Sequence, residues 1–193
     1  TFLLERNGMQ VVVSELNDVN GGSFRIYIRH KKATSTRFAT APQRHVAAYR
    51  VAATLAYEKK LGLKKKAAYT KFYKDMCALR AQTVAFIKKE KKKGKTIWGY
   101  GASTKGNTLL QWFGLDHTLI DAIAERQERK CGLKTVGTNI PIKSEKEMRE
   151  AKPDYLIILP WHFIAEFVQR EHEYLQSGGA FIVPCPRFEV IRG

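Results

Sequence analysis

The chain has 193 residues, of which 44% are hydrophobic, and its 34 lysines and arginines against 18 acidic residues give a formal net charge of +16. This composition is typical of a folded globular protein and excludes a largely disordered one. No stretch approaches the roughly 20 consecutive apolar residues of a membrane-spanning helix, and residues 1–6 lack the basic segment of a signal peptide. We therefore expect a cytoplasmic protein without membrane contacts. Because Thr1 stands in place of a methionine, we also expect a longer parent chain.

The cysteines and histidines show no ligand or disulfide pattern. Cys77, Cys131 and Cys185 are odd in number and far apart, which is typical of a reducing compartment. The five histidines have no metal-ligand spacing such as His-Glu-x-x-His. The sequence therefore predicts no metal site.

The excess positive charge leaves two interpretations open. Such an excess attracts any polyanion, including nucleic acid. Much of it, however, lies in the lysine runs 64–66, 88–89 and 91–93, near the ends of expected helices. Solvated lysines are ordinary there and suit the helix dipole. We favour a soluble surface, or a basic rim for an anionic substrate, over a nucleic-acid interface.

Two strands open the chain. Residues 9–16 are rich in β-branched and apolar side chains, and residues 23–29 alternate apolar with polar ones. The segment between them, Asn-Asp-Val-Asn-Gly-Gly at 17–22, has turn composition throughout. We expect a hairpin, or two strands that close the edge of a larger sheet.

Two helices follow the strands. Helical spacing of apolar residues extends over about 43–61 and 66–92. Gly62 and Gly94 follow these stretches at the usual place of a helix end. We refer to residues 34–93 as a predicted two-helix arm.

After Gly94 apolar strands alternate with helices. The expected strands are 95–99, 118–124, 154–159, 180–184 and one near 187–191, and the expected helices are 104–113, 144–151 and 161–176. This alternation predicts an α/β fold with a doubly wound, mainly parallel sheet over residues 94–193. In such sheets ligands bind at the carboxyl ends of the strands.

The segment Thr-Ile-Trp-Gly-Tyr-Gly-Ala-Ser-Thr-Lys-Gly-Asn at 96–107 joins a strand to a helix. Backbone N–H groups and a helix N-terminus meet in such a turn and attract a phosphate, and Lys105 adds a positive charge. The spacing is neither Gly-x-Gly-x-x-Gly, because position 104 is Thr and the next glycine is Gly106, nor that of a P-loop. Glu125 stands where an acid would bind the ribose of NAD. Phosphate binding is favoured over NAD, and a glycine turn needed only for packing is the alternative.

Two further clusters carry polar chemistry. Residues 17–25 surround two glycines with a carboxylate, amides, a hydroxyl and a guanidinium, which suits an active-site wall or simply a hairpin turn. Residues 160–163, Pro-Trp-His-Phe, lie at a strand-to-helix junction. There Trp161 could stack on a base and His162 could contact a phosphate or exchange a proton, or both could be core and helix-start residues.

Together these segments resemble the C-terminal module of the S-adenosylmethionine-dependent sugar C-methyltransferases, which methylate nucleotide-linked deoxysugars. The resemblance rests on Gly21-Gly22-Ser23-Phe24-Arg25, on the loop from Gly99 to Asn107, on residues 137–142 and on Leu159-Pro160-Trp161-His162. It spans nearly the whole chain in the same order. It implies a Rossmann-like fold for residues 94–193 and assigns residues 1–33 to the tail of a methyltransferase core plus the hairpin.

The resemblance also implies the function. A zinc-binding module and a domain that binds S-adenosylmethionine would precede this chain, which would be inactive alone and would bind no cofactor itself. Its partners would be a nucleotide-linked sugar and its own N-terminal methyltransferase domain. The implied substrate- and phosphate-binding residues are Gly99, Tyr100, Gly101, Ala102, Ser103, Lys105, Gly106, Asn107, Glu125, Trp161 and His162. The implied catalytic residues are Asp18, Asn20, Ser23 and Arg25.

One position departs from the family pattern. Well-known members carry His immediately before Gly-Gly-Ser, whereas this chain has Asn20. An amide cannot act as a general base near neutral pH, so proton abstraction would fall to Asp18, Glu15 or a residue of the preceding core. The sugar, the methylated atom and the reaction type therefore stay open. A basic nucleic-acid-binding module and an NAD-dependent Rossmann-type enzyme are the alternative functions.

Overall fold

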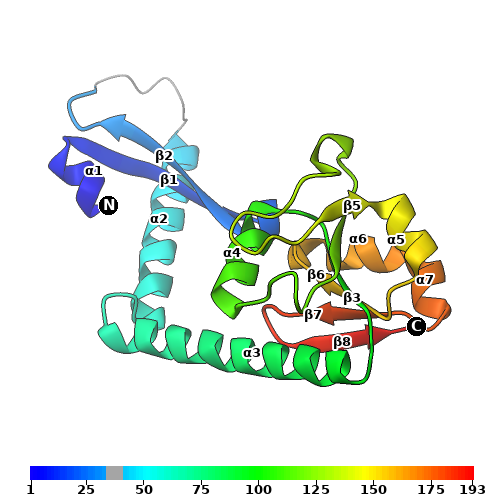
Figure 1. Cartoon of the computed structure of the whole chain (residues 1–193). Coiled ribbons are helices and arrows are strands. Elements are labelled where there is room, and N and C mark those ends of the chain that lie inside the picture. The colour runs from blue at the N-terminus through cyan, green and yellow to red at the C-terminus, as the bar shows by residue number, and fades with distance from the viewer. Residues whose placement is uncertain (34–40) are drawn as a thin grey trace. The chain divides into compact units, whose positions relative to one another are not determined.

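The computed structural model describes residues 1–33 and 41–193 (Figure 1). The chain forms two compact units, Thr1–Tyr73 and Lys74–Gly193. Helix α3 (Lys66–Lys92) belongs to both units. The division into segments 1–33, 34–93 and 94–193 stays a prediction.

The first unit contains the predicted hairpin. After α1 (Phe2–Arg6), strand β1 (Met9–Asn17) pairs antiparallel with β2 (Ser23–His30). The connecting 3-10 turn η1 (Val19–Gly21) holds Asn20 at a positive φ of 54°. Asparagine tolerates this left-handed conformation better than most residues, which explains an amide at this position.

Helix α2 (Ala41–Leu61) packs on β1. The Ser14 hydroxyl lies 2.8 Å from the Thr54 hydroxyl and donates to the Arg50 carbonyl at 3.2 Å. These bonds attach the helix to the strand. Both predicted helices, α2 and α3, are present with nearly the expected bounds.

The second unit is built on a six-stranded sheet in the order β5-β4-β3-β6-β7-β8. All neighbours pair in parallel except β7 and β8, which are antiparallel. Counted from β3, this is the strand order of the Rossmann fold, so the predicted Rossmann-like, mainly parallel sheet is confirmed. The strands are β3 (Ile97–Tyr100), β4 (Ala122–Glu125), β5 (Ile142–Ser144), β6 (Tyr155–Ile158), β7 (Ala180–Val183) and β8 (Glu189–Arg192).

Helices cover both faces of this sheet. Alternation within β3 sends Ile97 into one core cluster and Trp98 and Tyr100 into the other. The first cluster includes residues of α4 (Thr104–Phe113) and of the second half of α3. The second includes residues of α5 (Glu145–Ala151), α6 (Ile164–Arg170) and α7 (His172–Gln176).

Three expectations about single elements were wrong. The strand expected over 118–124 begins only at Ala122, because the Asp116 carboxylate accepts the Thr118 N–H and hydroxyl and holds a turn there. The helix expected over 161–176 is divided into a 3-10 turn, η3 (Trp161–Phe163), followed by α6 and α7. The short strand β5 was expected to be loop.

In the part of the chain that the structure describes, no helix combines the length and the apolar character needed to cross a bilayer. The same residues contain no cluster of three or more histidine, cysteine or acidic side chains placed to hold a metal ion.

Candidate functional site

The central feature of the second unit is the switch point of its sheet. Strands β3 and β6 are neighbours, but the chain leaves β3 toward β4 on one side and leaves β6 toward β7 on the other. In folds with this strand order the loops that follow the two strands diverge and ligands bind at the carboxyl edge between them, so we refer to this edge as the crevice. The fold thus brings residues 101–103 beside residues 160–162, two motifs that are far apart in the sequence.

Glycines allow these two loops to approach closely. Gly101 has a φ of 82°, and a Cβ atom there would lie 2.8 Å from Pro160 Cγ. A Cβ atom at Gly106 would lie 2.5 Å from Leu159 Cβ. Such distances exclude any side chain without movement of the β6 loop. The predicted packing role of the glycines is therefore present in the structure, and it also shapes the crevice.

Helix α4 begins at this crevice. Ser103 caps it, with the hydroxyl oxygen accepting the Gly106 N–H at 3.0 Å. The Ser103 carbonyl accepts the Asn107 N–H at 2.9 Å. The N-terminal end of a helix carries a partial positive charge, and Lys105 in its first turn adds a full one. This end of the crevice is suited to an anion.

Glu125, at the end of β4, is committed to contacts within the protein. Its carboxylate accepts the Ala102 N–H at 2.8 Å and the Gln127 N–H at 2.9 Å. Lys130 donates to the Ala102 carbonyl at 2.9 Å and lies 3.5 Å from the same carboxylate. Glu125 thus positions the glycine loop, and its predicted role in ligand binding stays a prediction.

Two buried polar atoms at the crevice have no hydrogen-bond partner among the described residues. They are Oδ1 of Asn107, on α4, and Nδ1 of His162, on η3. Burial and the nearby charge of Lys105 lower the pKa of His162, so its imidazole is neutral near pH 7. Buried polar atoms are nearly always paired in folded proteins, so these two are suited to a polar ligand.

Aromatic side chains accompany His162. Trp161 is partly buried and packs against both core clusters, with its ring edge-on to the imidazole at 6.4 Å. The Phe163 ring lies at a tilt beside the His162 imidazole, with the ring centres 4.3 Å apart, and Phe163 is 44% exposed. Trp161 is therefore partly a core residue, which is one of its two predicted roles. Phe163, to which the sequence assigned no role, adds an exposed aromatic ring.

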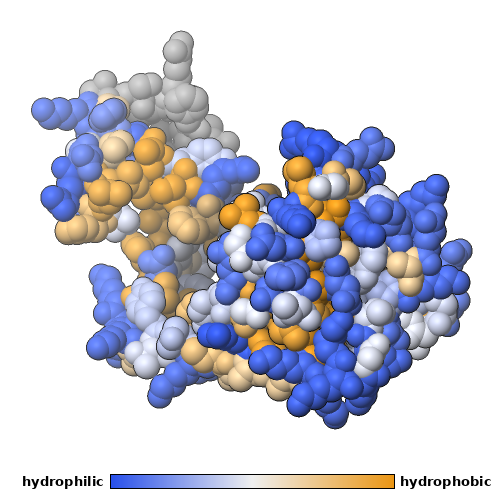
Figure 2. Space-filling view, viewed as in Figure 1, coloured by the Kyte–Doolittle hydropathy of each residue, from blue (hydrophilic) through white to orange (hydrophobic). Residues whose placement is uncertain are grey.

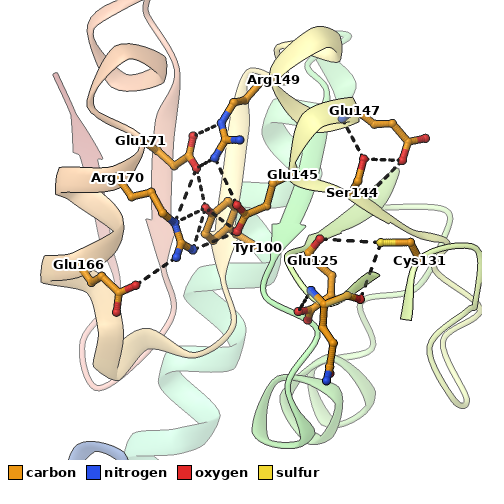
Figure 3. Close-up of polar contacts among 11 residues, drawn as sticks. Tyr100, Glu125, Cys131, Ser144, Glu145, Glu147, Arg149, Glu166, Arg170 and Glu171 are labelled. Carbon is orange, nitrogen blue, oxygen red and sulfur yellow. Dashed lines mark hydrogen bonds and ion pairs between the residues drawn. The ribbon is translucent and has the colours of Figure 1, made fainter. Parts of the chain in front are cut away.

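Tyr100 lies in a buried polar network that the sequence did not reveal (Figure 3). Its hydroxyl donates to Glu171 at 2.6 Å and accepts from Arg170 at 3.0 and 3.1 Å. Arg149 holds Glu171 through two contacts, and Glu145 pairs with Arg170 at 3.0 Å. The Tyr100 hydroxyl is therefore engaged on the face of the sheet away from α4. Only the backbone of Tyr100 remains for the predicted role in ligand binding.

The predicted catalytic residues lie together in the hairpin of the first unit. Asn17 Oδ1 accepts the Val19 N–H at 3.0 Å and the Ser23 hydroxyl at 2.7 Å, which fixes the turn. Asp18 and Asn20 are exposed in the turn, and Arg25 follows in β2. Their catalytic roles stay predictions.

Glu15, the other acid considered as a base, is paired with Arg50 at 3.1 Å. In β1 it lies opposite Arg25 in the register of the hairpin. The ion pair engages the Glu15 carboxylate within the first unit, and the identity of the proton acceptor stays a prediction.

A second hollow lies at the other end of α4. It has a volume of about 630 Å³ and is lined by residues 77–88 of α3 and by Phe113 and Gly114. Gly114 is the C-cap of α4, so this hollow is separated from the crevice by the length of that helix. It contains no paired acid, base or nucleophile arrangement that would support chemistry.

Comparisons with known proteins give a family match and a similar protein. Residues 18–186 match the family described as the C-methyltransferase C-terminal domain. The chain is also similar to the C-methyltransferase NovU of Streptomyces niveus, with 34% identity over 189 residues. That alignment covers 98% of this chain and 43% of the relative, so the chain spans less than half the length of the curated relative it matches.

Proposed function

Since the chain belongs to the C-methyltransferase C-terminal domain family, we propose that it is the substrate-binding domain of an S-adenosylmethionine-dependent C-methyltransferase acting on a nucleotide-linked sugar. The single observation that carries this proposal is the crevice at the switch point. It combines the N-terminus of α4 and Lys105 with the buried, unpartnered atoms of Asn107 and His162.

The chemistry of these groups fits a nucleoside diphosphate. Lys105 and the helix N-terminus supply positive charge for the diphosphate. Asn107 Oδ1 can accept a hydrogen bond, and neutral His162 can donate or accept one, so both suit hydroxyl or amide groups of the ligand. Phe163, exposed beside His162, offers a surface on which a base can stack.

The glycine loop of this unit departs from the dinucleotide-binding pattern, because position 104 is Thr. At the end of the second strand, where an acid binds the ribose of NAD in such sites, Glu125 already accepts two backbone N–H groups. We therefore propose that S-adenosylmethionine, which supplies the methyl group, is bound by another region of the complete protein. Asp18, Asn20, Ser23 and Arg25 are proposed to serve the reaction once that region is present.

Calorimetric titration of the chain with thymidine diphosphate tests this function. Lys105→Ala should weaken binding at least about tenfold, because it removes the full positive charge beside the N-terminus of α4. The matched control is Lys146→Ala, which removes a lysine that is 85% exposed on α5 and should leave the affinity unchanged. Gly101→Val is unsuitable as a site variant because its side chain would collide with Pro160.

Three other ligands complete the titration. S-adenosylmethionine and NAD should give no heat of binding with this chain. A short RNA should bind no more tightly than thymidine diphosphate at physiological salt. Equal losses of affinity in the two lysine variants, or RNA binding that falls steeply with salt and ignores Lys105, would contradict the proposal and favour a basic nucleic-acid module.

A further inference from the structure

The polar network around Tyr100 lies at the carboxyl end of β3, directly before the glycine loop (Figure 3). The Tyr100 hydroxyl donates to Glu171 at 2.6 Å and accepts two hydrogen bonds from Arg170 at 3.0 and 3.1 Å. The backbone of the same residue continues into Gly101, and its carbonyl accepts the N–H of Leu159, in the loop after β6, at 3.2 Å. One residue therefore connects the network with both loops of the crevice.

The network fixes the Tyr100 ring because its other members are held as well. Burial, and then the hydrogen bond to Glu171, raise the pKa of the Tyr100 hydroxyl, which therefore stays protonated at neutral pH and keeps donating. Arg149 contacts Glu171 through two nitrogens, and Glu145 pairs with Arg170 at 3.0 Å. A buried polar network whose members are all satisfied makes its surroundings rigid.

A series of aromatic contacts joins this network to His162. Phe163 and Phe167 are four residues apart and Arg170 follows three residues later, so the three side chains share one face of α6. The Arg170 guanidinium lies 4.9 Å from the ring centre of Phe167 and 5.5 Å from that of Tyr100. The Phe167 ring centre lies 5.0 Å from that of Tyr100 and 6.2 Å from that of Phe163. Phe163 in turn lies 4.3 Å from the His162 imidazole.

These ring contacts determine the orientation of His162. Its buried Nδ1 atom has no hydrogen-bond partner among the described residues, so no hydrogen bond at that atom directs the ring. Phe163 and Trp161 flank the imidazole instead. Because packed side chains transmit small displacements to their neighbours, a shift of α6 would change the direction in which Nδ1 points.

We propose that Tyr100, Arg170 and Glu171 are positioning residues for the proposed ligand site. Together they fix the loop after β3 relative to η3 and α6, and thereby set the direction in which the His162 imidazole points. This inference rests on the proposed function, because the site is the proposed nucleotide site. The three side chains act through the glycine loop and His162, since the Tyr100 hydroxyl lies on the face of the sheet away from α4.

The same sheet contains a matched control. The Tyr155 hydroxyl donates to Glu90 at 3.1 Å and accepts from Arg192 at 3.2 Å, so it too connects a glutamate with an arginine. Tyr155 is 5% exposed and Tyr100 is 1% exposed. Tyr155 pairs with Ile97, the first residue of β3, so it lies about 10 Å along the strands from the carboxyl edge. Tyr155→Phe therefore removes an equivalent hydroxyl without altering the crevice.

Calorimetric titration of Tyr100→Phe and Tyr155→Phe with thymidine diphosphate tests the proposal. Tyr100→Phe should weaken binding about fivefold, because the loop and α6 lose the hydroxyl that connects them. Tyr155→Phe should stay within about twofold of the unchanged chain, because its site is distant from the crevice. Both variants should unfold at similarly lowered urea concentrations, because each loses one buried hydroxyl that pairs with an arginine and a glutamate.

NMR of the histidine side chains gives a second measurement that needs no ligand. The imidazole signals of His162 are assigned by their loss in His162→Asn. They should shift in Tyr100→Phe, because the ring contacts that orient the imidazole begin at Tyr100. They should stay in place in Tyr155→Phe, although that variant is equally destabilised.

The other outcomes separate this proposal from the proposed function. Equal losses of affinity in the two tyrosine variants would assign the effect to general stability and overturn the proposal, as would an unchanged affinity in Tyr100→Phe. His162 signals that do not shift in Tyr100→Phe would also overturn it. Shifted His162 signals in that variant, with no binding of thymidine diphosphate by the unchanged chain, would refute the nucleotide assignment and support the positioning of His162.

Discussion

The two units of this protein differ in what stabilises them. The second unit buries strands from both sides, and side chains such as Ile157 and Phe181 are fully inaccessible. The first unit exposes most of its large hydrophobic side chains, including Phe24 and Tyr49. The comparison teaches that the second unit buries its apolar side chains within the chain, whereas the first unit leaves many of its own exposed (Figure 2).

The difference also separates two kinds of site. In the second unit, tight packing around Gly101 and Gly106 holds the loops after β3 and β6 in one arrangement, so the proposed ligand site is preformed. In the first unit the proposed catalytic residues lie on an exposed hairpin. Packing within the chain therefore surrounds these residues less closely than it surrounds the glycine loop.

The largest expected effect comes from a matched pair of phenylalanines. Phe181→Ala removes a fully buried ring and should lower the free energy of unfolding by about 3–5 kcal/mol. Phe24→Ala should change it by less than about 0.5 kcal/mol, because that ring is 66% exposed. Urea unfolding followed by far-ultraviolet circular dichroism measures both variants, because both units contain helices and strands that contribute to this signal. Similar losses in the two variants would break the comparison.

Glu171→Gln should have the next largest effect. Glu171 is 2% exposed and accepts from Tyr100 and Arg149, so loss of its charge leaves the buried Tyr100 hydroxyl and the half-exposed Arg149 guanidinium poorly paired. We expect a loss of about 3 kcal/mol in the free energy of unfolding. The control is Glu166→Gln, because Glu166 also pairs with an arginine of the network, Arg170, but is 56% exposed. This substitution should lower the free energy of unfolding by less than about 1 kcal/mol. Equal costs would mean that the network does not stabilise the second unit.

Acidic pH should weaken the second unit through Asp154. Burial raises the pKa of this carboxyl, but hydrogen bonds from Lys95 and Thr96 outweigh it and leave the pKa below its ordinary value of 3.8. Because folding lowers this pKa, the stabilisation is complete at pH values above the ordinary pKa of the carboxyl. It is lost as the pH falls through the pKa of the folded state. Asp154→Asn should therefore flatten the decline of the unfolding free energy below about pH 4. An unchanged slope in denaturant melts at pH 3–6 would contradict this assignment.

The smallest effect is expected at an exposed ion pair. Lys146→Ala removes the contact with Glu150 at 3.9 Å, in which the lysine is 85% exposed. The free energy of unfolding should change by less than about 0.5 kcal/mol. A loss above 1 kcal/mol in the same urea melts would show that surface charge contributes more to this unit than its packing suggests.

Much of the fold could be predicted because local signals agree with the tertiary structure. The bounds of α4 follow from Ser103 as its cap and Gly114 at its end, both of which have those roles in the structure. The hairpin follows from alternation in β2 and from the turn residues around Gly21. For the crevice, the sequence predicted that two polar motifs follow parallel strands at their carboxyl ends.

The remainder depends on contacts that the sequence does not display. The apolar spacing continues through Phe167 and Tyr174 and predicts one helix. The structure instead has two helices, and Glu171, which lies between α6 and α7, accepts hydrogen bonds from Tyr100 and Arg149. Strand β5 has only three residues and forms because it pairs with β4. The engagement of Glu125 by the Ala102 N–H likewise requires the folded loop.

The most direct measurement of the central claim is a two-dimensional NMR titration of the chain with thymidine diphosphate. Backbone amide shifts report the location of the ligand without any variant. We predict saturable shifts confined to residues 101–107 and 161–163, on the two sides of the crevice. Shifts spread along the lysines of α3, or no shifts at all at millimolar ligand, would contradict the assignment of this crevice to a nucleotide-linked substrate.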